Sequence, residues 1–260
     1  MKFVMTQSIC PEGIEKLKAD TNGQVEIIAE DNPDPNNYLD DMKDADALIV
    51  RIAKCDAHAI ENSPNLKVIG RTGVGYDSVD VKKATELGIP VVWNSSGYEC
   101  VETLRMLDGL VQVYLPDLKY ALSGPAARYS AAADYPQVAR AAILEMYRQT
   151  GPFRLDDDGM LQRGVLIRHL ILPQQGENTR RVIDWVGETF APGQVLFSLM
   201  SQYTPVGDLA QWPELQHPIS PELNDEMYQY LIESPIADGF YQDLDAATGD
   251  MIPAFDGTGV

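Results

Sequence analysis

The chain has 260 residues, of which 45% are hydrophobic and 23% are charged, so it can bury the core of one large or two small α/β domains. Its formal net charge is −19, and so acidic a surface repels phosphate backbones and anionic lipids, which argues against nucleic-acid and membrane partners. It has neither a signal-peptide core in Met1–Gln7 nor an apolar run of about 18 residues that would span a membrane, so we expect a cytoplasmic protein.

Residues 1–93 alternate short apolar runs with more polar segments, a rhythm that predicts strands separated by helices. The expected strands are Lys2–Thr6, Val25–Ala29, Ala47–Val50, Leu66–Ile69 and Ile89–Trp93. The expected helices are Pro11–Ala19, Asn37–Lys43, Ala57–Asn62 and Val79–Leu87, the last closed by Gly88 in the left-handed conformation. Because the strands are continuous runs of Val, Ile and Leu, we expect a parallel sheet covered on both faces.

From Asn94 onward the alternation continues with longer helices. The expected strands are Val111–Leu115, Gly164–Leu172 and Val195–Met200. The expected helices are Glu99–Leu107, Tyr135–Gln149, Thr179–Phe190 and Ser220–Glu233, the last with Ser220 as its cap and Pro221 in its first turn. The tail Asp238–Val260 is rich in Gly and Asp and is expected to be irregular. No low-complexity linker separates the two halves.

A glycine-rich turn, Gly70–Asp77, follows an expected strand and precedes an expected helix. Glycines let a backbone approach a ligand closely, and free backbone amides favour an anion. Ser78 stands where the dinucleotide-binding fingerprint requires its third glycine, so the cofactor motif is weak. Two interpretations stay open: a turn that cradles a carboxylate, and a tight turn without a ligand.

Several segments of the first half together resemble the D-2-hydroxyacid dehydrogenases, with phosphoglycerate dehydrogenase as the nearest type. They are Asp46–Arg51, Pro64–Asp77, Val79–Val81 and Gly88–Val91, and the resemblance covers residues 1–92. It implies a flavodoxin-like substrate domain in which Arg51 faces the substrate and the amides of Val74 and Gly75 hold its carboxylate. The family's NAD-binding domain and its catalytic Arg, Glu and His do not follow, so neither bound NAD nor a catalytic residue is expected.

Polar side chains also follow the expected strands of the second half, where the carboxyl ends of parallel strands converge. Asp117, Lys119 and Arg168 would suit a zwitterion, with a carboxylate for an amino group and two cations for a carboxylate. The alternative is an ion-pair cluster without a ligand. His169, in an apolar strand, is interpreted as a core residue rather than a ligand.

Residues 90–260 resemble the radical S-adenosylmethionine proteins of the pyruvate formate-lyase activating-enzyme type, through Arg163–Pro173 and Ile252–Val260. The resemblance implies a partial (βα) barrel whose Asp117, Lys119 and Arg168 hold S-adenosylmethionine, with Asn94 and Ser96 as weaker candidates. The family's Cys-x3-Cys-x2-Cys motif is missing. The three cysteines, Cys10, Cys55 and Cys100, lie far apart, so neither a [4Fe–4S] cluster nor another metal is expected.

The sequence therefore predicts an α/β chimera: a flavodoxin-like parallel sheet in residues 1–93, fused to the C-terminal part of a partial (βα) barrel in residues 94–260. An open sheet is preferred to one closed barrel of eight strands. The main functional prediction is a radical S-adenosylmethionine-like fragment with a residual cofactor pocket and no radical chemistry. The alternatives are a D-2-hydroxyacid dehydrogenase-like protein without its NAD domain, and a non-catalytic recombinant or engineered chimera. A small-molecule ligand is the expected partner, and both catalysis and oligomeric state stay open.

Overall fold

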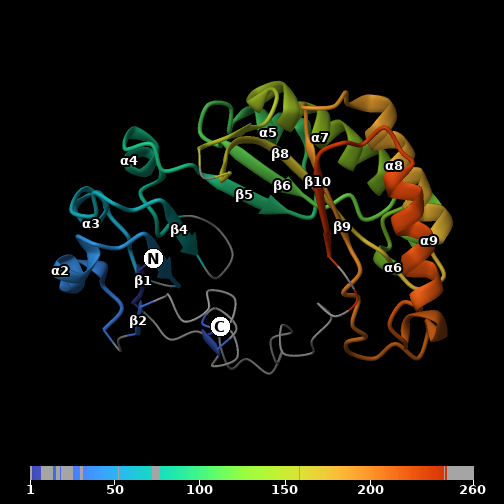
Figure 1. Cartoon of the computed structure of the whole chain (residues 1–260), viewed down its shortest axis with the longest axis horizontal. Helices are drawn as coiled ribbons and strands as arrows, with labels where there is room; N and C mark the ends of the chain where they lie inside the picture. Colours follow the sequence, from blue (N-terminus) through green and yellow to red (C-terminus); the bar gives the residue numbers. More distant parts are fainter. Residues whose placement is uncertain are drawn as a thin grey trace. The chain divides into compact units, whose positions relative to one another are not determined.

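A computed structural model describes residues 2–6, 14, 15, 18, 26–29, 32–51, 53–71, 77–157, 159–242 and 244. The chain divides into two units that meet between Val91 and Val92, which we call unit 1 and unit 2. The sequence places this boundary after Trp93. Each unit has its own parallel sheet, so the predicted α/β class is confirmed (Figure 1).

The sheet of unit 1 is built from four short parallel strands, in the order β2-β1-β3-β4. They are β1 (Lys2–Met5), β2 (Glu26–Ala29), β3 (Ala47–Val50) and β4 (Val68–Arg71). Strand order reverses between β1 and β3, because β2 lies on one side of β1 and the later strands lie on the other. Such a reversal opens a crevice at the carboxyl ends of the two strands, where α/β sheets commonly bind ligands.

Among the described residues of unit 1, three short helices and a 3-10 turn follow these strands. They are η1 (Pro35–Tyr38), α2 (Leu39–Met42), α3 (Ala57–Glu61) and α4 (Val81–Glu86). Side chains of Asp56 and Asp80 cap α3 and α4 by accepting backbone N–H bonds, and Gly88 follows α4 with φ +80° as predicted. The predicted helix Pro11–Ala19 lies largely outside the described residues.

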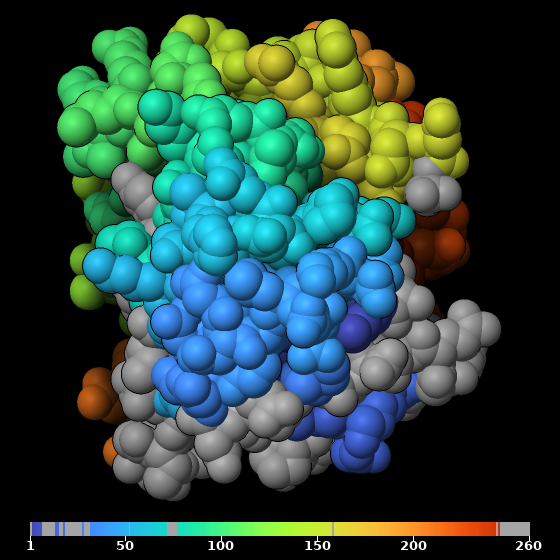
Figure 2. Space-filling view, turned by 90° about the vertical axis from the view of Figure 1, so that its left-hand side faces the viewer, coloured from blue at the N-terminus to red at the C-terminus, as the bar shows by residue number. Residues whose placement is uncertain are grey.

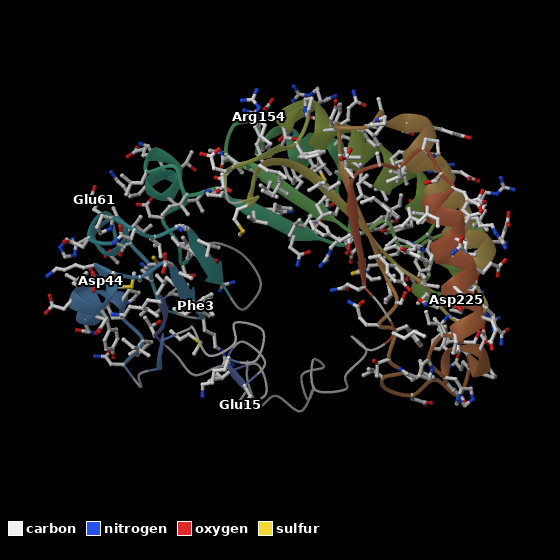
Figure 3. The ribbon with its side chains drawn as sticks, viewed as in Figure 1. Phe3, Glu15, Asp44, Glu61, Arg154 and Asp225 are labelled. Carbon is white, nitrogen blue, oxygen red and sulfur yellow. The ribbon has the colours of Figure 1, made fainter. Side chains whose placement is uncertain are left out.

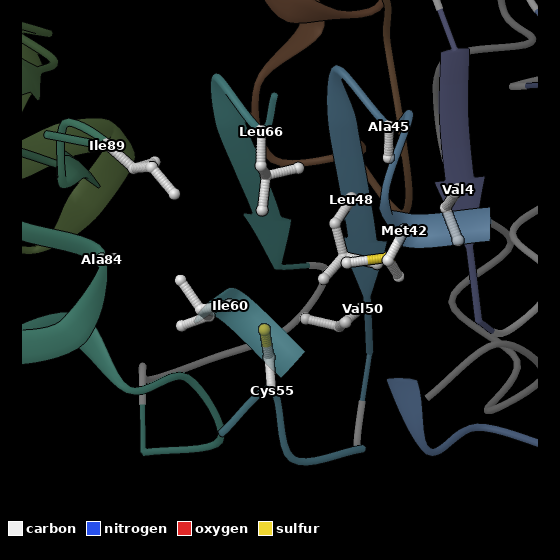
Figure 4. Close-up of a cluster of buried hydrophobic side chains, with 10 residues drawn as sticks. All are labelled: Val4, Met42, Ala45, Leu48, Val50, Cys55, Ile60, Leu66, Ala84 and Ile89. Carbon is white, nitrogen blue, oxygen red and sulfur yellow. The ribbon is translucent and has the colours of Figure 1, made fainter. Parts of the chain in front are cut away.

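The core of unit 1 forms where the helices pack on one face of the sheet (Figure 4). Val4, Leu48 and Val50 point from β1 and β3 toward Met42 of α2 and Ile60 of α3. These residues alternate along their strands, as the period of two requires. Right-handed crossovers place α2 and α3 on the same face. Figure 2 shows the blue and cyan segment that contains these helices forming the surface on that side.

The sheet of unit 2 is open and follows chain order, β10-β9-β8-β6-β5. Its parallel strands are β5 (Val92–Ser95), β6 (Val113–Pro116), β8 (Leu161–Leu170), β9 (Leu196–Met200) and β10 (Gly239–Gln242). A short strand, β7 (Arg154–Leu155), pairs antiparallel with the start of β8. The described strands thus form two separate sheets, and the single closed barrel that the sequence left open is not formed.

The helices of unit 2 are α5 (Val101–Arg105), α6 (Ser123–Ser130), α7 (Tyr135–Thr150), α8 (Gly176–Thr189) and α9 (Pro221–Ile232), with a 3-10 turn η2 (Pro213–Leu215). Except for α5, they are longer than those of unit 1, and α7, α8 and α9 begin at or close to their predicted positions. Ser220 caps α9 through its hydroxyl and Pro221 is the first helical residue, as predicted. The sequence missed α6, whose Ser-Gly-Pro start hides the helical pattern. No helix within the described ranges is long and apolar enough to cross a membrane.

Two strand predictions need correction. The predicted fifth strand, Ile89–Trp93, does not join the first sheet, because β5 begins at Val92 and pairs with β6 in the second. The tail from Asp238 is not irregular throughout, because β10 pairs with β9. Gly239 permits this pairing, since a Cβ at that position would lie 1.9 Å from the Phe197 carbonyl oxygen.

Candidate functional site

The first candidate site lies at the carboxyl edge of the unit 1 sheet. Val50 of β3 pairs with Arg71 of β4, so Arg51 and Arg71 emerge from neighbouring strand ends. Arg51 is half-buried and follows the strand that borders the switch point. Val74 and Gly75, predicted to hold a substrate carboxylate, lie outside the described residues. The structure therefore places two arginines at neighbouring strand ends, although the sequence singled out only Arg51.

Ser78 explains why the third glycine of the dinucleotide fingerprint is absent. Its hydroxyl accepts a 2.9 Å hydrogen bond from Nε of Arg71, and Ser78 is buried. The Ser78 carbonyl accepts a 2.7 Å bond from the amide of Cys55, and the Asp80 amide donates at 2.9 Å to the Cys55 carbonyl. The segments that follow β3 and β4 are thereby tied together, which fixes the end of the glycine-rich turn.

Thr6 is a second residue at this edge that the sequence did not single out as functional. It follows β1, its amide donates to the Ile49 carbonyl at 3.3 Å, and it is fully buried. Its hydroxyl has no hydrogen-bond partner among the residues that the structure describes. A buried hydroxyl without a partner is costly, so its place at the switch point is consistent with a ligand-binding crevice. One feature of the sequence could have pointed to Thr6 as a site residue, because it is the last residue of the predicted first strand.

The second candidate site lies at the carboxyl edge of the unit 2 sheet, where four of the five predicted side chains come together. Nη2 of Arg168 lies 2.6 Å from Oδ1 of Asp117 and donates at 2.8 Å to Oδ1 of Asn94. Nζ of Lys119 lies 3.6 Å from Oδ2 of Asp117. Ser96 is exposed and reaches this group only through its backbone carbonyl. The zwitterion-binding role stays a prediction.

A buried tyrosine joins the loops that follow β5 and β6. The Tyr135 hydroxyl lies 2.7 Å from the carbonyl oxygens of both Ser96 and Asp117, and it accepts a 2.9 Å hydrogen bond from the Lys119 amide. Burial raises the pKa of Tyr135, so the hydroxyl keeps its proton and can donate to a carbonyl. Gly97 also lies close to the end of β6, since a Cβ there would be 2.3 Å from the Asp117 carbonyl. These contacts fix both loops.

Two more buried side chains hold the loop that carries Lys119. Oδ1 of Asn178 accepts from the Ala121 amide at 2.9 Å, and Nδ2 of Asn178 donates to the Lys119 carbonyl at 3.1 Å. Nδ1 of His169 lies 2.7 Å from the Leu118 carbonyl and Nε2 lies 3.0 Å from the Thr179 hydroxyl. Burial lowers the pKa of His169 to about 4, so the ring is neutral near pH 7. His169 has both partners it needs, consistent with the predicted core role.

The cysteines that the structure describes are both reduced. Cys55 is buried and Cys100 is exposed, whereas Cys10 lies outside the described residues. Burial raises the pKa of the Cys55 thiol to about 12, so it is an unreactive thiol at neutral pH. Within the described ranges, no group of three His, Cys, Asp or Glu side chains is arranged to hold a metal ion.

Comparison with known proteins finds similarity in about the first hundred residues of the chain. Residues 3–101 match the family model described as D-isomer specific 2-hydroxyacid dehydrogenase, catalytic domain. A D-3-phosphoglycerate dehydrogenase of Methanocaldococcus jannaschii is 36% identical over 112 residues, which are 43% of this chain and 20% of that protein. A glyoxylate reductase of Pyrococcus furiosus is 35% identical over 92 residues, which are 35% of this chain and 27% of that protein. The chain thus spans about a quarter or less of the relatives' lengths.

A similar solved structure is the NAD+-bound 3-phosphoglycerate dehydrogenase of Entamoeba histolytica. It is 14% identical, the alignment covers 96% of this chain and 89% of that chain, and the TM-score is 0.32. A TM-score of that size carries no argument about the arrangement of this chain.

These findings correct the main functional prediction. The family model and the curated relatives above are named for 2-hydroxyacid dehydrogenases and a glyoxylate reductase, so the prediction of a radical S-adenosylmethionine-like function is wrong. Neither a radical S-adenosylmethionine segment nor a chimera is supported. The prediction of S-adenosylmethionine as cofactor is also wrong, because the matching family model and the curated relatives are named as dehydrogenases or reductases. The dehydrogenase-like alternative fits the findings better.

Proposed function

We propose that the first hundred residues form the substrate-binding segment of a D-2-hydroxyacid oxidoreductase. The observation that carries this proposal is the family match of residues 3–101, whose Arg51 follows the strand at the topological switch point. Two features of the fold support it independently of the match: the strand order β2-β1-β3-β4 belongs to flavodoxin-like sheets, and their ligands bind at the β1/β3 reversal.

The residues of this segment would bind and orient the substrate. The backbone amides of Val74 and Gly75 would hold the substrate carboxylate, as the sequence resemblance implies, and Arg51 would neutralise the charge beside it. Bound nicotinamide would supply the hydride chemistry of such an enzyme. The fingerprint that cradles a dinucleotide is incomplete here, because Ser78 replaces its third glycine and binds Arg71. We therefore assign this segment to the substrate and derive no hydride-transfer step from it.

The charge at this edge indicates which 2-hydroxyacid fits best. Arg51 and Arg71 lie at adjacent strand ends, and although Arg71 already donates from Nε to Ser78, the positive charge of both residues favours a substrate with two anionic groups. The relatives are named for D-3-phosphoglycerate and for glyoxylate, of which only the first carries a phosphate in addition to its carboxylate. We favour a phosphorylated 2-hydroxyacid.

Calorimetric titration of the full chain tests this proposal with D-3-phosphoglycerate and D-glycerate, which differ only by the phosphate. We expect D-3-phosphoglycerate to bind more tightly. Substitution of Arg51 by Gln should weaken the binding of D-3-phosphoglycerate about tenfold or more, because it removes a charge-assisted hydrogen bond. Lys67→Gln is the matched control, because Lys67 precedes β4 at the opposite edge of the sheet. The absence of binding by either acid, or equal effects of the two substitutions, would contradict the proposal.

A further inference from the structure

A long connection follows β9 at the carboxyl edge of the unit 2 sheet. It runs from Ser201 to Ser220, where α9 begins, and η2 is the one helix or strand within it. A connection between a strand and the next helix usually has about two to six residues. Long connections with little regular structure are often lids or binding loops, so this segment is a candidate for such a role.

The middle of this connection, residues 203–215, forms a loop that closes on itself. The Tyr203 hydroxyl donates at 2.7 Å to the Leu215 carbonyl, so the two ends of the loop lie together. The Trp212 amide donates at 2.9 Å to the Leu209 carbonyl within the same loop. Compact loops whose ends meet are frequently functional. Because its hydrogen bonds are largely internal, this loop can move as one body.

One carboxylate fastens the loop to another part of unit 2. Oε1 of Glu214 accepts from Nε of Arg128 at 2.8 Å and from the Tyr129 hydroxyl at 2.9 Å, and Nη2 of Arg128 lies 2.7 Å from the same oxygen. Among the described residues, no other hydrogen bond or ion pair of residues 203–215 leaves the connection between β9 and α9. Glu214 thus has the place of a latch.

The latch reaches past a neighbouring strand. Arg128 and Tyr129 belong to α6, which follows β6, whereas the loop follows β9, and β8 stands between those two strands. Gln175, at the start of α8, donates at 3.0 Å to the Tyr129 hydroxyl. Segments that follow three adjacent strands therefore meet at Tyr129, and the closed loop spans the carboxyl end of β8.

The latch is weak enough to open. The Arg128 side chain is 53% exposed, and an ion pair with an exposed partner contributes little net stability because water competes for both charges. Leu215 and Ile219, the buried apolar side chains of the connection, stand near its C-terminal end, and the tip around Gly207 is exposed. The loop can therefore swing about its C-terminal end once the latch breaks.

Two polar atoms at the start of the connection favour a second arrangement. Oγ of Ser201 and Oε1 of Gln202 are buried and have no hydrogen-bond partner among the described residues. Such atoms cost free energy while they are buried, and that cost is recovered when water reaches them. The closed arrangement is thus not fully satisfied, which brings an open arrangement closer to it in free energy.

We propose that residues 203–215 are a lid at the carboxyl ends of β8 and β9, held closed by the latch between Glu214 and α6. In the open state the carboxylate leaves Arg128 and Tyr129, and water reaches Ser201 and Gln202. The lid controls access to the edge of the sheet at which the second candidate site also lies. The proposal concerns unit 2 alone and does not depend on the function proposed for unit 1.

Double electron–electron resonance on the full chain tests the latch. Nitroxide labels at Gln211→Cys in the lid and Glu188→Cys at the far end of α8, both exposed positions, report where the lid lies. The background is Cys10→Ser/Cys100→Ser, in which buried Cys55 stays unlabelled. We expect one narrow distance distribution with Glu214 in place. Glu214→Gln removes the charge and should raise a population at longer distance several-fold.

Two further variants make the result specific. Arg128→Met breaks the latch from its other side and should open the lid as well, which keeps the test valid if one variant does not fold. Glu226→Gln is the matched control, because it removes the carboxylate of another ion pair of unit 2, on α9 beside Asp225 (Figure 3). Unchanged distances in both latch variants, or equal opening by Glu226→Gln, would overturn the proposal.

A buried reporter tests whether the lid controls access. Ser201 is 1% exposed, so a Ser201→Cys thiol in the same background should react slowly with a maleimide while the lid is closed. Glu214→Gln should speed this reaction several-fold, whereas Glu226→Gln should leave its rate unchanged. Equal rates with and without the latch would show that the loop does not act as a lid, and fast reaction with the latch intact would contradict the closed state.

Discussion

At the scale of single residues, burial decides the protonation of His169. The ring is 1% exposed, and its Nδ1 must carry the proton because its partner, the Leu118 carbonyl, can only accept. Nε2 then accepts from the Thr179 hydroxyl. A second proton would place a charge in the core away from water, which is why burial lowers the pKa of His169 to about 4.

This histidine should make unit 2 less stable in acid. The unfolded chain binds a proton near pH 6.5 and the folded chain only near pH 4, so the free energy of unfolding should fall between those values as pH decreases. The loss from His169 should be about 3 kcal/mol. Urea unfolding from pH 7 to 4, followed by fluorescence, measures it. His169→Gln should flatten the slope, whereas exposed His217→Gln should not, and equal slopes in both variants would contradict the argument.

Most of the unit 2 cluster was predictable from its sequence, because its polar residues stand at or near the carboxyl ends of apolar strand patterns. Asn94, Asp117, Lys119 and Arg168 meet at one edge since parallel strands share their direction. Tyr135 and Asn178 were not predictable, because each acts from a helix through hydrogen bonds to backbone atoms distant in sequence. Residue type alone does not reveal such contacts.

At the scale of secondary-structure elements, apolar runs predicted β1, β3 and β9 well because each is buried. The sequence missed the early start of β8, where Arg163 pairs with Arg154 of β7. It also missed β10, whose Gly239-Phe240-Tyr241-Gln242 is short and lies between aspartates. Both the early start of β8 and the strand β10 depend on pairing with strands distant in sequence, and the local sequence pattern does not encode such pairing.

Attachment of β10 should depend on the absence of a side chain at Gly239. Gly239→Ala would place a Cβ against the Phe197 carbonyl, so we expect β10 to separate from β9 at a cost of about 2 kcal/mol or more. Gly193→Ala is the control, because Gly193 has φ +81° and no atom within 4 Å of an added Cβ, and it should cost about 1 kcal/mol. Hydrogen exchange of the Phe240–Gln242 amides measures the separation. Unchanged protection in Gly239→Ala would refute this account.

At the scale of the whole molecule, each of the two units has its own sheet and its own buried side chains. The cluster of Val4, Leu48 and Ile60 belongs to unit 1 alone. All three tryptophans, Trp93, Trp185 and Trp212, belong to unit 2. The two halves were predicted from resemblances to two families, and the comparisons support only the dehydrogenase resemblance of the first half.

Two local probes should therefore report separate unfolding events. Tryptophan fluorescence follows unit 2, and labelling of Cys55 by a thiol reagent follows unit 1, because this buried thiol with a pKa of about 12 reacts only after opening. In urea we expect different midpoints in a Cys10→Ser/Cys100→Ser background. In a Cys10→Ser variant that keeps Cys100, this exposed thiol should react already in the folded state and serves as the control. Coincident midpoints with both probes would instead show one cooperative domain.

The chain-ordered sheet of unit 2 also bears on how the protein emerges from the ribosome. Each new strand docks on the one made before it, so the sheet can grow from β5 toward β10 while translation continues. Until β10 has been synthesised, β9 presents an unpaired edge to other nascent chains. Strand β10 thus covers an edge of β9 that would otherwise be prone to aggregation. Premature termination before Gly239 would leave that edge exposed.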